Sequence, residues 1–250
     1  MYSKAVVRKP GRNFPQGITT SNLGKPDFEK ALEQHAAYRE ALAVCGLEVT
    51  VLEADERFPD GCFVEDTAIV APGVAIITRP GALSRRGEEV EIGKVLSGIM
   101  DTVTVVTPGT LEGGDVLRMD NHYFIGISER TNSAGASQLS SILTQHGFTT
   151  SVAEVSAGLH LKSDIAYLGN GNIISTPAFS GLVPSANVII TEPEENYSAN
   201  CLRVNDYLLI PRGFPKSKKK IEDLGYNIIE LDMSEFRKLD GGLTCLSLLF

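Results

Sequence analysis

Four short polar segments of this sequence carry side chains that could do chemistry together. Each precedes a short apolar stretch, and they read Pro-Asp-Gly-Cys-Phe-Val-Glu-Asp at 59–66, Leu-Glu-Gly-Gly-Asp at 111–115, Leu-His-Leu-Lys-Ser-Asp at 159–164 and Asp-Gly-Gly-Leu-Thr-Cys at 240–245. They combine several carboxylates with the imidazole of His160 and the thiol of Cys245. A thiolate is a nucleophile, and an imidazole or a cation beside it lowers the pKa of the thiol. If the fold brings these segments together, they form a nucleophilic site.

Each residue type would serve a separate step at such a site. A cysteine attacks, and a histidine with an ordinary pKa of about 6.5 can protonate a leaving amine and then deprotonate water. A carboxylate can hold the imidazole in one tautomer. The excess of carboxylates favours a cationic substrate.

Taken one by one, these residues also have structural interpretations. Cys245 stands in an apolar C-terminal stretch, where most cysteines act as small buried hydrophobes. His160 could be a core histidine, and Glu65 and Asp66 could be turn acids. A functional interpretation is favoured because such groups occur at equivalent positions of a repeat.

That repeat consists of a polar tip followed by a short apolar strand, a turn and a second apolar strand. The tips are anchored at Asp66, Asp115, Asp164, Asn200 and Thr244, which are 49, 49, 36 and 44 residues apart. Turn signals such as Pro-Gly at 72–73 and Asp-Asn at 120–121 separate the two strands. The spacing therefore predicts five related units.

Amphipathic segments follow the hairpins, and each leads into another strand. We expect helices at 27–45, 88–100, 134–146 and 216–224, three of which run up to a glycine, a residue that commonly ends helices. Residues 179–187 should form a shortened connection, which would explain the spacing of 36 residues.

The fifth unit lacks a second strand because the sequence ends at Phe250. Residues 4–8, followed by Lys-Pro-Gly, resemble 76–78, followed by Arg-Pro-Gly, and could supply it. Pairing the first strand with the last would close a ring, remove exposed sheet edges and direct the five tips at one central cavity. The alternative is an open sandwich with incidental similarity between the units.

Composition bounds the class of protein. The chain has 250 residues, 42% hydrophobic, which allows one large globular domain or two small ones; the single domain that we expect over 1–250 follows from the resemblance described below. A net charge of −8 argues against nucleic-acid binding, and no apolar run approaches the roughly 20 residues of a membrane span. The first residues lack a secretory signal, so we expect a cytoplasmic protein. Cysteines and histidines are scattered without metal-ligand spacing, so we expect no metal.

The ordered set of motifs resembles the dimethylarginine dimethylaminohydrolases, members of the guanidino-group-modifying superfamily. The resemblance covers nearly the whole chain and is specific because of the order and spacing of its parts. These include Leu-Gly-Lys-Pro-Asp at 23–27, Phe-Val-Glu-Asp at 63–66, Ile-Thr-Arg-Pro-Gly-Ala at 77–82, Ser-Arg-Arg-Gly-Glu at 84–88, Leu-Glu-Gly-Gly-Asp at 111–115, Arg-Thr-Asn at 130–132, Leu-His-Leu-Lys at 159–162, Ala-Asn-Cys at 199–201 and Asp-Gly-Gly-Leu-Thr-Cys at 240–245.

The resemblance implies an α/β fold of the pentein type, a five-bladed pseudo-symmetric α/β propeller, in agreement with the ring inferred from the repeat. It implies hydrolysis of Nω-methylated L-arginine to L-citrulline and methylamine or dimethylamine without a cofactor. The enzyme class would be that of hydrolases acting on C–N bonds of amidines, with a covalent S-alkylthiouronium intermediate on cysteine.

Residue roles follow from the resemblance as expectations. Cys245 would be the nucleophile, His160 the general acid and base, and Glu112 the residue that orients His160 and faces the guanidinium. The expected substrate-binding residues are Ile18, Asp60, Glu65, Asp66, Arg85, Arg130 and Leu239. Among these, Asp66 would bind the guanidinium and Arg85 and Arg130 the α-carboxylate, while Asp60 and backbone oxygens near Ile18 and Leu239 would hold the α-amino group.

Two other functions compete with this one. The same machinery could act on arginine, agmatine or another guanidine, although two arginines for a carboxylate argue against agmatine. A non-catalytic pentein that only binds would be expected to lack the nucleophile or the base. The expected partner is a small guanidino amino acid, and exposed propeller faces suggest a homodimer.

Overall fold

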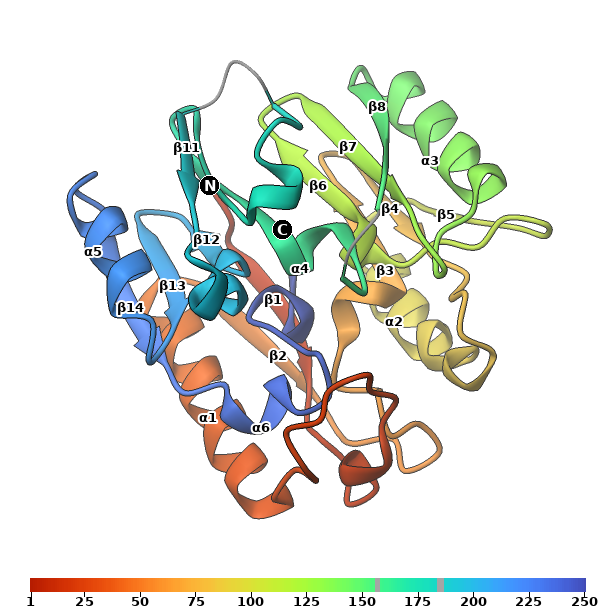
Figure 1. Ribbon diagram of the computed structural model, residues 1–250. Helices are drawn as coiled ribbons and strands as arrows, with labels where there is room; N and C mark the ends of the chain where they lie inside the picture. The colour runs from red at the N-terminus through yellow and green to blue at the C-terminus, as the bar shows by residue number, and fades with distance from the viewer. Residues whose placement is uncertain (156–157, 184–186) are drawn as a thin grey trace.

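The computed structural model describes residues 1–155, 158–183 and 187–250. It contains five three-stranded sheets of one design (Figure 1). In the first unit, β3 (Ala68–Ala71) pairs antiparallel with β4 (Val74–Ile77), and β4 pairs parallel with β5 (Thr102–Thr104). The predicted fivefold repeat is therefore confirmed, with a parallel third strand completing each hairpin.

The remaining sheets repeat this order of pairing. Their strands are β15 (Leu248–Leu249), β1 (Lys4–Arg8) and β2 (Glu48–Leu52); β6 (Val116–Met119), β7 (His122–Ile127) and β8 (Thr149–Glu154); β9 (Ile165–Gly169), β10 (Asn172–Ser175) and β11 (Asn187–Ile190); β12 (Leu202–Val204), β13 (Tyr207–Pro211) and β14 (Asn227–Leu231).

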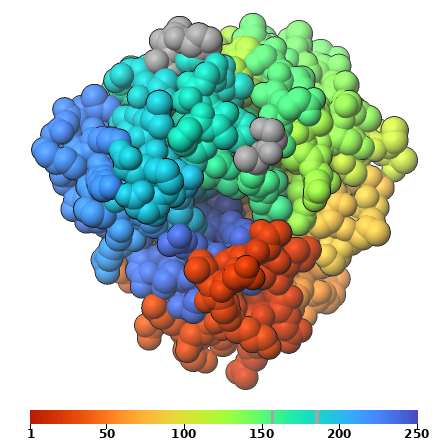
Figure 2. All heavy atoms as spheres, viewed as in Figure 1, coloured from red at the N-terminus to blue at the C-terminus, as the bar shows by residue number. Residues whose placement is uncertain are grey.

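The ring closes by pairing the first strand with the last. β1 runs antiparallel to β15, with Ala5 opposite Leu249 and Val6 opposite Leu248. Figure 2 shows the five units following one another around the molecule, from red and orange through yellow, green and cyan to blue. The predicted closure is confirmed, and the open sandwich is wrong.

Four longer helices lie at the periphery and connect the second strand of a unit to its third (Figure 1). They are α1 (Phe28–Val44), α2 (Glu88–Ser97), α3 (Ser133–Gln145) and α5 (Pro215–Glu222). The predicted ranges are right to within a few residues; the largest difference is at α2, which ends three residues before the predicted 100. Among the described residues, no helix is long and apolar enough to cross a membrane.

Sequence signals fix the ends of α1. The Asp27 carboxylate accepts a hydrogen bond from Lys30 N at 2.9 Å and caps the first turn. Gly46 follows the last turn with φ +89, a left-handed conformation that favours glycine. The shortened connection of the third unit contains the short turn η5 (Pro177–Phe179), whereas residues 184–186 lie outside the described part of the chain.

The polar tips are short helical segments of three to seven residues, a feature that the sequence analysis missed. Each tip ends directly before the first strand of its unit or is separated from it by one or two residues. They are η2 (Val64–Thr67), η4 (Gly113–Asp115), α4 (Leu161–Asp164), η6 (Pro193–Ala199) and η7 (Thr244–Leu246). In sequence around the ring, η7 contacts η2, η2 contacts η4, η4 contacts α4 and α4 contacts η6.

Anchor residues of the repeat link neighbouring tips through hydrogen bonds. Asp66 Oδ1 accepts from Gly114 N at 2.8 Å, and Asp115 Oδ1 accepts from Leu161 N at 3.1 Å. Asn200 Oδ1 accepts from Thr244 N at 3.1 Å and joins the fourth unit to the fifth. Because buried backbone N–H groups need acceptors, these polar anchors hold the centre of the ring together.

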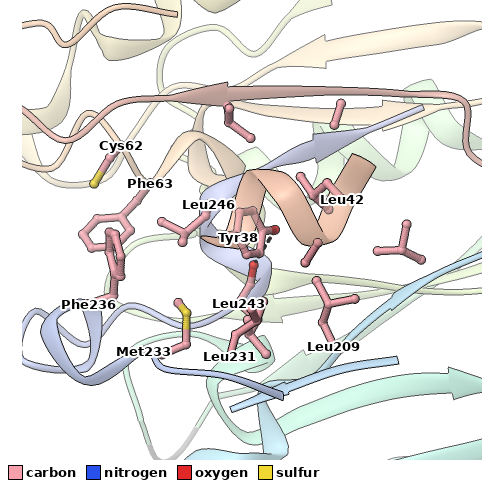
Figure 3. Packing of buried hydrophobic residues seen from close by; sticks show 14 of the residues in the cluster. Tyr38, Leu42, Cys62, Phe63, Leu209, Leu231, Met233, Phe236, Leu243 and Leu246 are labelled. Atoms are coloured by element: carbon pink, nitrogen blue, oxygen red, sulfur yellow. Dashed lines mark hydrogen bonds between the residues drawn. The ribbon is translucent and has the colours of Figure 1, made fainter. Parts of the chain in front are cut away.

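An aromatic and aliphatic core lies beneath the fifth tip (Figure 3). Tyr38 of α1 is fully buried there, and its hydroxyl donates to Leu243 O at 2.8 Å and shares a second hydrogen bond with Ser247 Oγ at 2.7 Å. Leu243 and Ser247 flank Cys245 on either side. The core thus fixes the backbone that carries the thiol.

Candidate active site

The tips bring the histidine and two carboxylates into contact at the centre of the ring. His160 Nε2 lies 2.8 Å from Glu112 Oε2 and 3.9 Å from Asp66 Oδ1. Cys245 is partly exposed, whereas Cys45, Cys62 and Cys201 are all buried. The thiol that the sequence placed at a tip is therefore the accessible one of the four.

Glu112 is held by a loop of its own unit and by a loop of the preceding unit. Its side chain has no exposed surface, and Oε1 accepts from Gly81 N at 3.0 Å and from Ala82 N at 3.3 Å. Its backbone N donates to Thr131 Oγ1 at 3.1 Å. With Oε1 fixed by the backbone, Oε2 points at His160, so Glu112 can orient the imidazole.

The two glycines after Glu112 permit this close approach. A Cβ at Gly114 would lie 2.6 Å from the ring of His160, and one at Gly113 would lie 2.0 Å from Glu65 O. Neither contact can be accommodated without moving backbone or the histidine. The Gly-Gly pair thus serves packing at the site, beyond forming a bend.

The charges of the site favour an imidazolium between two carboxylates. Burial alone would lower the pKa of His160, but Asp66, Glu112 and Asp115 outweigh it and raise the pKa to about 9. Burial would raise the pKa of Asp66, yet His160 and Arg85 lower it to about 2. For Glu112, the hydrogen bond from His160 and the charge of Arg85 likewise overcome burial and lower the pKa.

The pKa of the Cys245 thiol, the expected nucleophile, is raised by its surroundings. Burial, followed by the negative charges of Glu65 and Asp66, raises the pKa of Cys245 to about 12, against a smaller opposing effect of the Gly242 N–H. That N–H donates to Sγ at 3.3 Å. A cation at the site would favour the thiolate.

Arg85 is buried in an ion-pair cluster with Asp66 and Glu88, close to Glu112. It ends η3 (Leu83–Arg85), and its Nη1 lies 2.6 Å from Asp66 Oδ2. The other side of the guanidinium meets Glu88 at 2.8 Å and donates to Phe63 O at 3.1 Å. Burial raises the pKa of Glu88 to about 7, against the charge of Arg85. Glu88 did not emerge as a functional residue from the sequence, although its spacing from Arg85 in the 84–88 motif is a signal for such a pair.

Arg130 approaches the site from the loop between β7 and α3. Its Nη1 lies 3.7 Å from Glu112 Oε1, and its side chain retains 14% exposure. Its backbone N donates to Ser128 Oγ at 2.9 Å, and Ser128 in turn donates to Asp115 Oδ2 at 2.6 Å. Arg130 is thus a cation near the carboxylates that keeps access to solvent.

Asp60, Ile18 and Leu239 gather at one place. Ile18 N donates to both oxygens of Asp60, at 3.1 and 3.3 Å, and Asp60 is 5% exposed. A Cβ at Gly17 would lie 2.7 Å from Asp60 Oδ1 and 2.9 Å from Leu239 Cδ1. The structure therefore brings these three predicted residues together, with a buried carboxylate among them.

Glu65 contacts other protein groups with both oxygens. Oε1 lies 2.6 Å from Lys162 Nζ, and Oε2 accepts from Thr244 Oγ1 at 2.8 Å. A cavity of about 690 Å³ along the first strands of the five units reaches Glu65, Lys162 and Thr244 but is not lined by Cys245 or His160. Glu65 thus lines that cavity from η2, the tip that also carries Asp66.

One donor atom each of Asp66, Glu112 and His160 lies within 4.8 Å of the others, a spacing that could hold a metal ion. Arg85 already pairs with Asp66, and the raised pKa of His160 means that a proton competes for its nitrogen. Acid–base chemistry fits this set better than metal ligation does.

The fold and this cysteine–histidine–carboxylate site define a pentein of the guanidino-group-modifying class. The profile of the family described as "N,N dimethylarginine dimethylhydrolase, eukaryotic" matches residues 24–239. The chain belongs to the dimethylarginine dimethylaminohydrolase family.

Similarity to individual members extends over full length. The chain is 44% identical to the N(G),N(G)-dimethylarginine dimethylaminohydrolase of Pseudomonas aeruginosa over 100% of both chains, and 37% identical to that of Streptomyces coelicolor over 98% and 95%. A cysteine-to-serine variant of the Pseudomonas aeruginosa protein, complexed with citrulline, superposes with a TM-score of 0.98 at 44% identity over 100% of both chains. A histidine-to-glycine variant of a dimethylarginine dimethylaminohydrolase, solved as an adduct with S-methyl-L-thiocitrulline, gives the same values. The predicted pentein fold and family are confirmed.

Proposed function

We propose that this chain hydrolyses Nω-methylated L-arginines to L-citrulline and methylamine or dimethylamine through a covalent S-alkylthiouronium on Cys245. Family membership makes it a dimethylargininase-type hydrolase, EC 3.5.3.18, whose ligands are guanidino amino acids. The observation that supports the mechanism is the buried His160 imidazole between Glu112 and Asp66, together with the partly exposed thiol of Cys245 on the tip η7.

The substrate itself activates the nucleophile in this mechanism. A guanidinium bound by Asp66 and Glu112 places a positive charge beside Cys245, which lowers the raised pKa of the thiol. The thiol proton leaves to water, and Sγ then bonds to the guanidinium carbon. Thiolate and guanidinium charges cancel, so the tetrahedral adduct is neutral.

His160 serves both following steps. Its imidazolium gives a proton to the methylated nitrogen as the C–N bond breaks, so a neutral amine leaves and a thiouronium cation remains on Cys245. The neutral imidazole then takes a proton from water as the water oxygen attacks the same carbon. Cleavage of the C–S bond releases citrulline, with one proton passing to solvent, and restores the thiolate and the imidazolium.

Other predicted residues are assigned to the amino-acid end of the substrate. Asp60, with the backbone around Ile18 and Leu239, binds the α-amino group. Arg130, which remains partly exposed, and Arg85 bind the α-carboxylate. Glu65 acts through its contacts with Lys162 and Thr244 beside the thiol.

The substrate assignment is tested by measuring citrulline release from asymmetric dimethylarginine, monomethylarginine and arginine, and N-carbamoylputrescine release from agmatine. We expect both methylated substrates to have the higher kcat/KM. If only arginine or agmatine were turned over, the proposed mechanism would stand but the assignment of methylated arginines as substrates would be wrong. No turnover of any would favour a protein that only binds guanidino ligands.

The raised pKa of His160 predicts the pH dependence. In the substrate complex, where the bound guanidinium keeps Cys245 as a thiolate, the amine leaves only if His160 still holds its proton, so kcat should fall as the pH rises through about 9, where that proton is lost. The α-amino group of the substrate also titrates in the alkaline range. Glu112→Gln distinguishes His160 from the α-amino group. This substitution removes a carboxylate that raises the pKa of His160, so the alkaline side of the pH profile should move to lower pH. A limb that does not move in Glu112→Gln would belong to another group.

Two expectations stay predictions. A homodimer is checked by light scattering during size-exclusion chromatography, and the cytoplasmic location by fractionating cells that express the protein.

A further inference from the structure

Glu88 is a buried carboxylate whose contacts join it to the site through one arginine. It is the first residue of α2, and its side chain is 2% exposed. Its Oε2 accepts from Arg85 Nη2 at 2.8 Å and from Arg85 Nε at 3.1 Å, and its Oε1 lies 3.3 Å from the same Nε. The hydrogen bonds of this side chain to the described residues all go to Arg85.

This bidentate contact fixes the plane of the guanidinium. Arg85 Nη2 uses its second N–H on Phe63 O, and Nη1 uses one N–H on Asp66 Oδ2 at 2.6 Å. A guanidinium has five N–H donors, so a single N–H, on Nη1, is left for another acceptor. Nη1 lies 3.9 Å from Glu112 Oε2, which places it at the edge of the catalytic cluster.

Without the charge of Glu88, Arg85 would keep Asp66 and Glu112 as its anionic neighbours. A buried arginine that loses one carboxylate partner turns toward those that remain, because an uncompensated buried charge is costly. The Arg85 guanidinium would then rotate out of its present plane, in which one Nη1 N–H is free for another acceptor. Arg85 would also compete more strongly for the carboxylates that receive the substrate guanidinium.

We propose that Glu88 is a positioning residue for substrate binding, which holds Arg85 so that its remaining N–H meets the substrate α-carboxylate. This inference rests on the proposed function, since it needs a substrate with an α-carboxylate. Glu88 makes no hydrogen bond to Cys245 or His160. Its replacement should therefore affect substrate binding more than the chemical steps.

The test is Glu88→Gln, which keeps the size of the side chain and removes its charge. We expect KM for monomethylarginine to rise about tenfold or more, while kcat changes by less than about threefold. Nω-monomethylagmatine lacks the α-carboxylate, so its kcat/KM should fall much less. Glu88→Asp, which restores the charge on a shorter side chain, should recover part of the loss.

Glu91→Gln is the matched control on the same helix. Glu91 also pairs with an arginine, Arg8, at 2.7 Å, but it is half exposed and belongs to no part of the site. The KM of the Glu91→Gln variant for monomethylarginine should match that of the wild type. An unchanged KM in Glu88→Gln, an equal loss for both substrates, or a loss confined to kcat would overturn the inference. The wild-type substrate panel separates this result from failure of the proposed function, because that failure would appear before any variant is made.

Discussion

Replacing Cys245 with serine is expected to lower kcat for methylated arginines by about ten-thousand-fold or more and to leave the fold intact. Removal of a nucleophile that acts as part of a catalytic unit has effects of this order. Serine is nearly isosteric, and the hydrogen bond that the Cys245 side chain accepts comes from Gly242 N. The hydroxyl pKa is too high for a bound guanidinium to yield an alkoxide, so the substrate-driven activation fails.

The measurement is citrulline release at saturating substrate, with thermal unfolding and binding of citrulline as checks on the fold. Cys45→Ser is the control, because Cys45 is a buried thiol at the end of α1 and belongs to none of the polar tips. We expect its kcat to match that of the wild type. A folded Cys245→Ser protein with near-normal kcat would rule out covalent catalysis by this residue.

Replacing His160 with glycine is expected to separate the two halves of the reaction. With asymmetric dimethylarginine the amine cannot leave without a proton, so kcat should fall by about a hundredfold to ten-thousandfold. S-methyl-L-thiocitrulline carries a thiolate leaving group, which departs without that proton. The Cys245 adduct should therefore form and persist, because no base activates water. The adduct of the similarly substituted relative with this compound supports the expectation.

Intact-protein mass spectrometry after addition of each compound measures this directly. His146→Gly serves as the control, since His146 follows α3 at the surface and should leave turnover unchanged. Continued hydrolysis of both compounds by His160→Gly would contradict the dual acid–base role.

Local patterns in the sequence were sufficient to predict the ring. A polar anchor, an apolar strand and a turn recur because each unit must bury one hairpin and point one tip inward. Gly46 marked the end of α1 for the reason that the structure shows, whereas the cap that Asp27 provides at its start was not anticipated. The pairing of β1 with β15 followed from an incomplete fifth unit. The helical form of the tips was missed because such short segments have too few residues to show a helical period.

Contacts inside the site depend on tertiary packing and could not be predicted in this way. Nothing near Glu112 in the sequence indicates that Gly81 N and Ala82 N would hold its carboxylate. The partners of Arg85 were equally hidden, since burial decides whether an arginine meets a carboxylate of its own chain or one of the substrate. The assignment of Cys245 and His160 came from the motif order, which local propensity alone would not have supplied.

The most direct test of the account is to stop the reaction with acid within one turnover and map the thiouronium by peptide mass spectrometry. With asymmetric dimethylarginine, we expect the adduct on the peptide that contains Cys245, rising before citrulline appears and decaying as it accumulates. An adduct on Cys62 or Cys201, or citrulline formed in a first turnover without any protein adduct, would contradict covalent catalysis by Cys245.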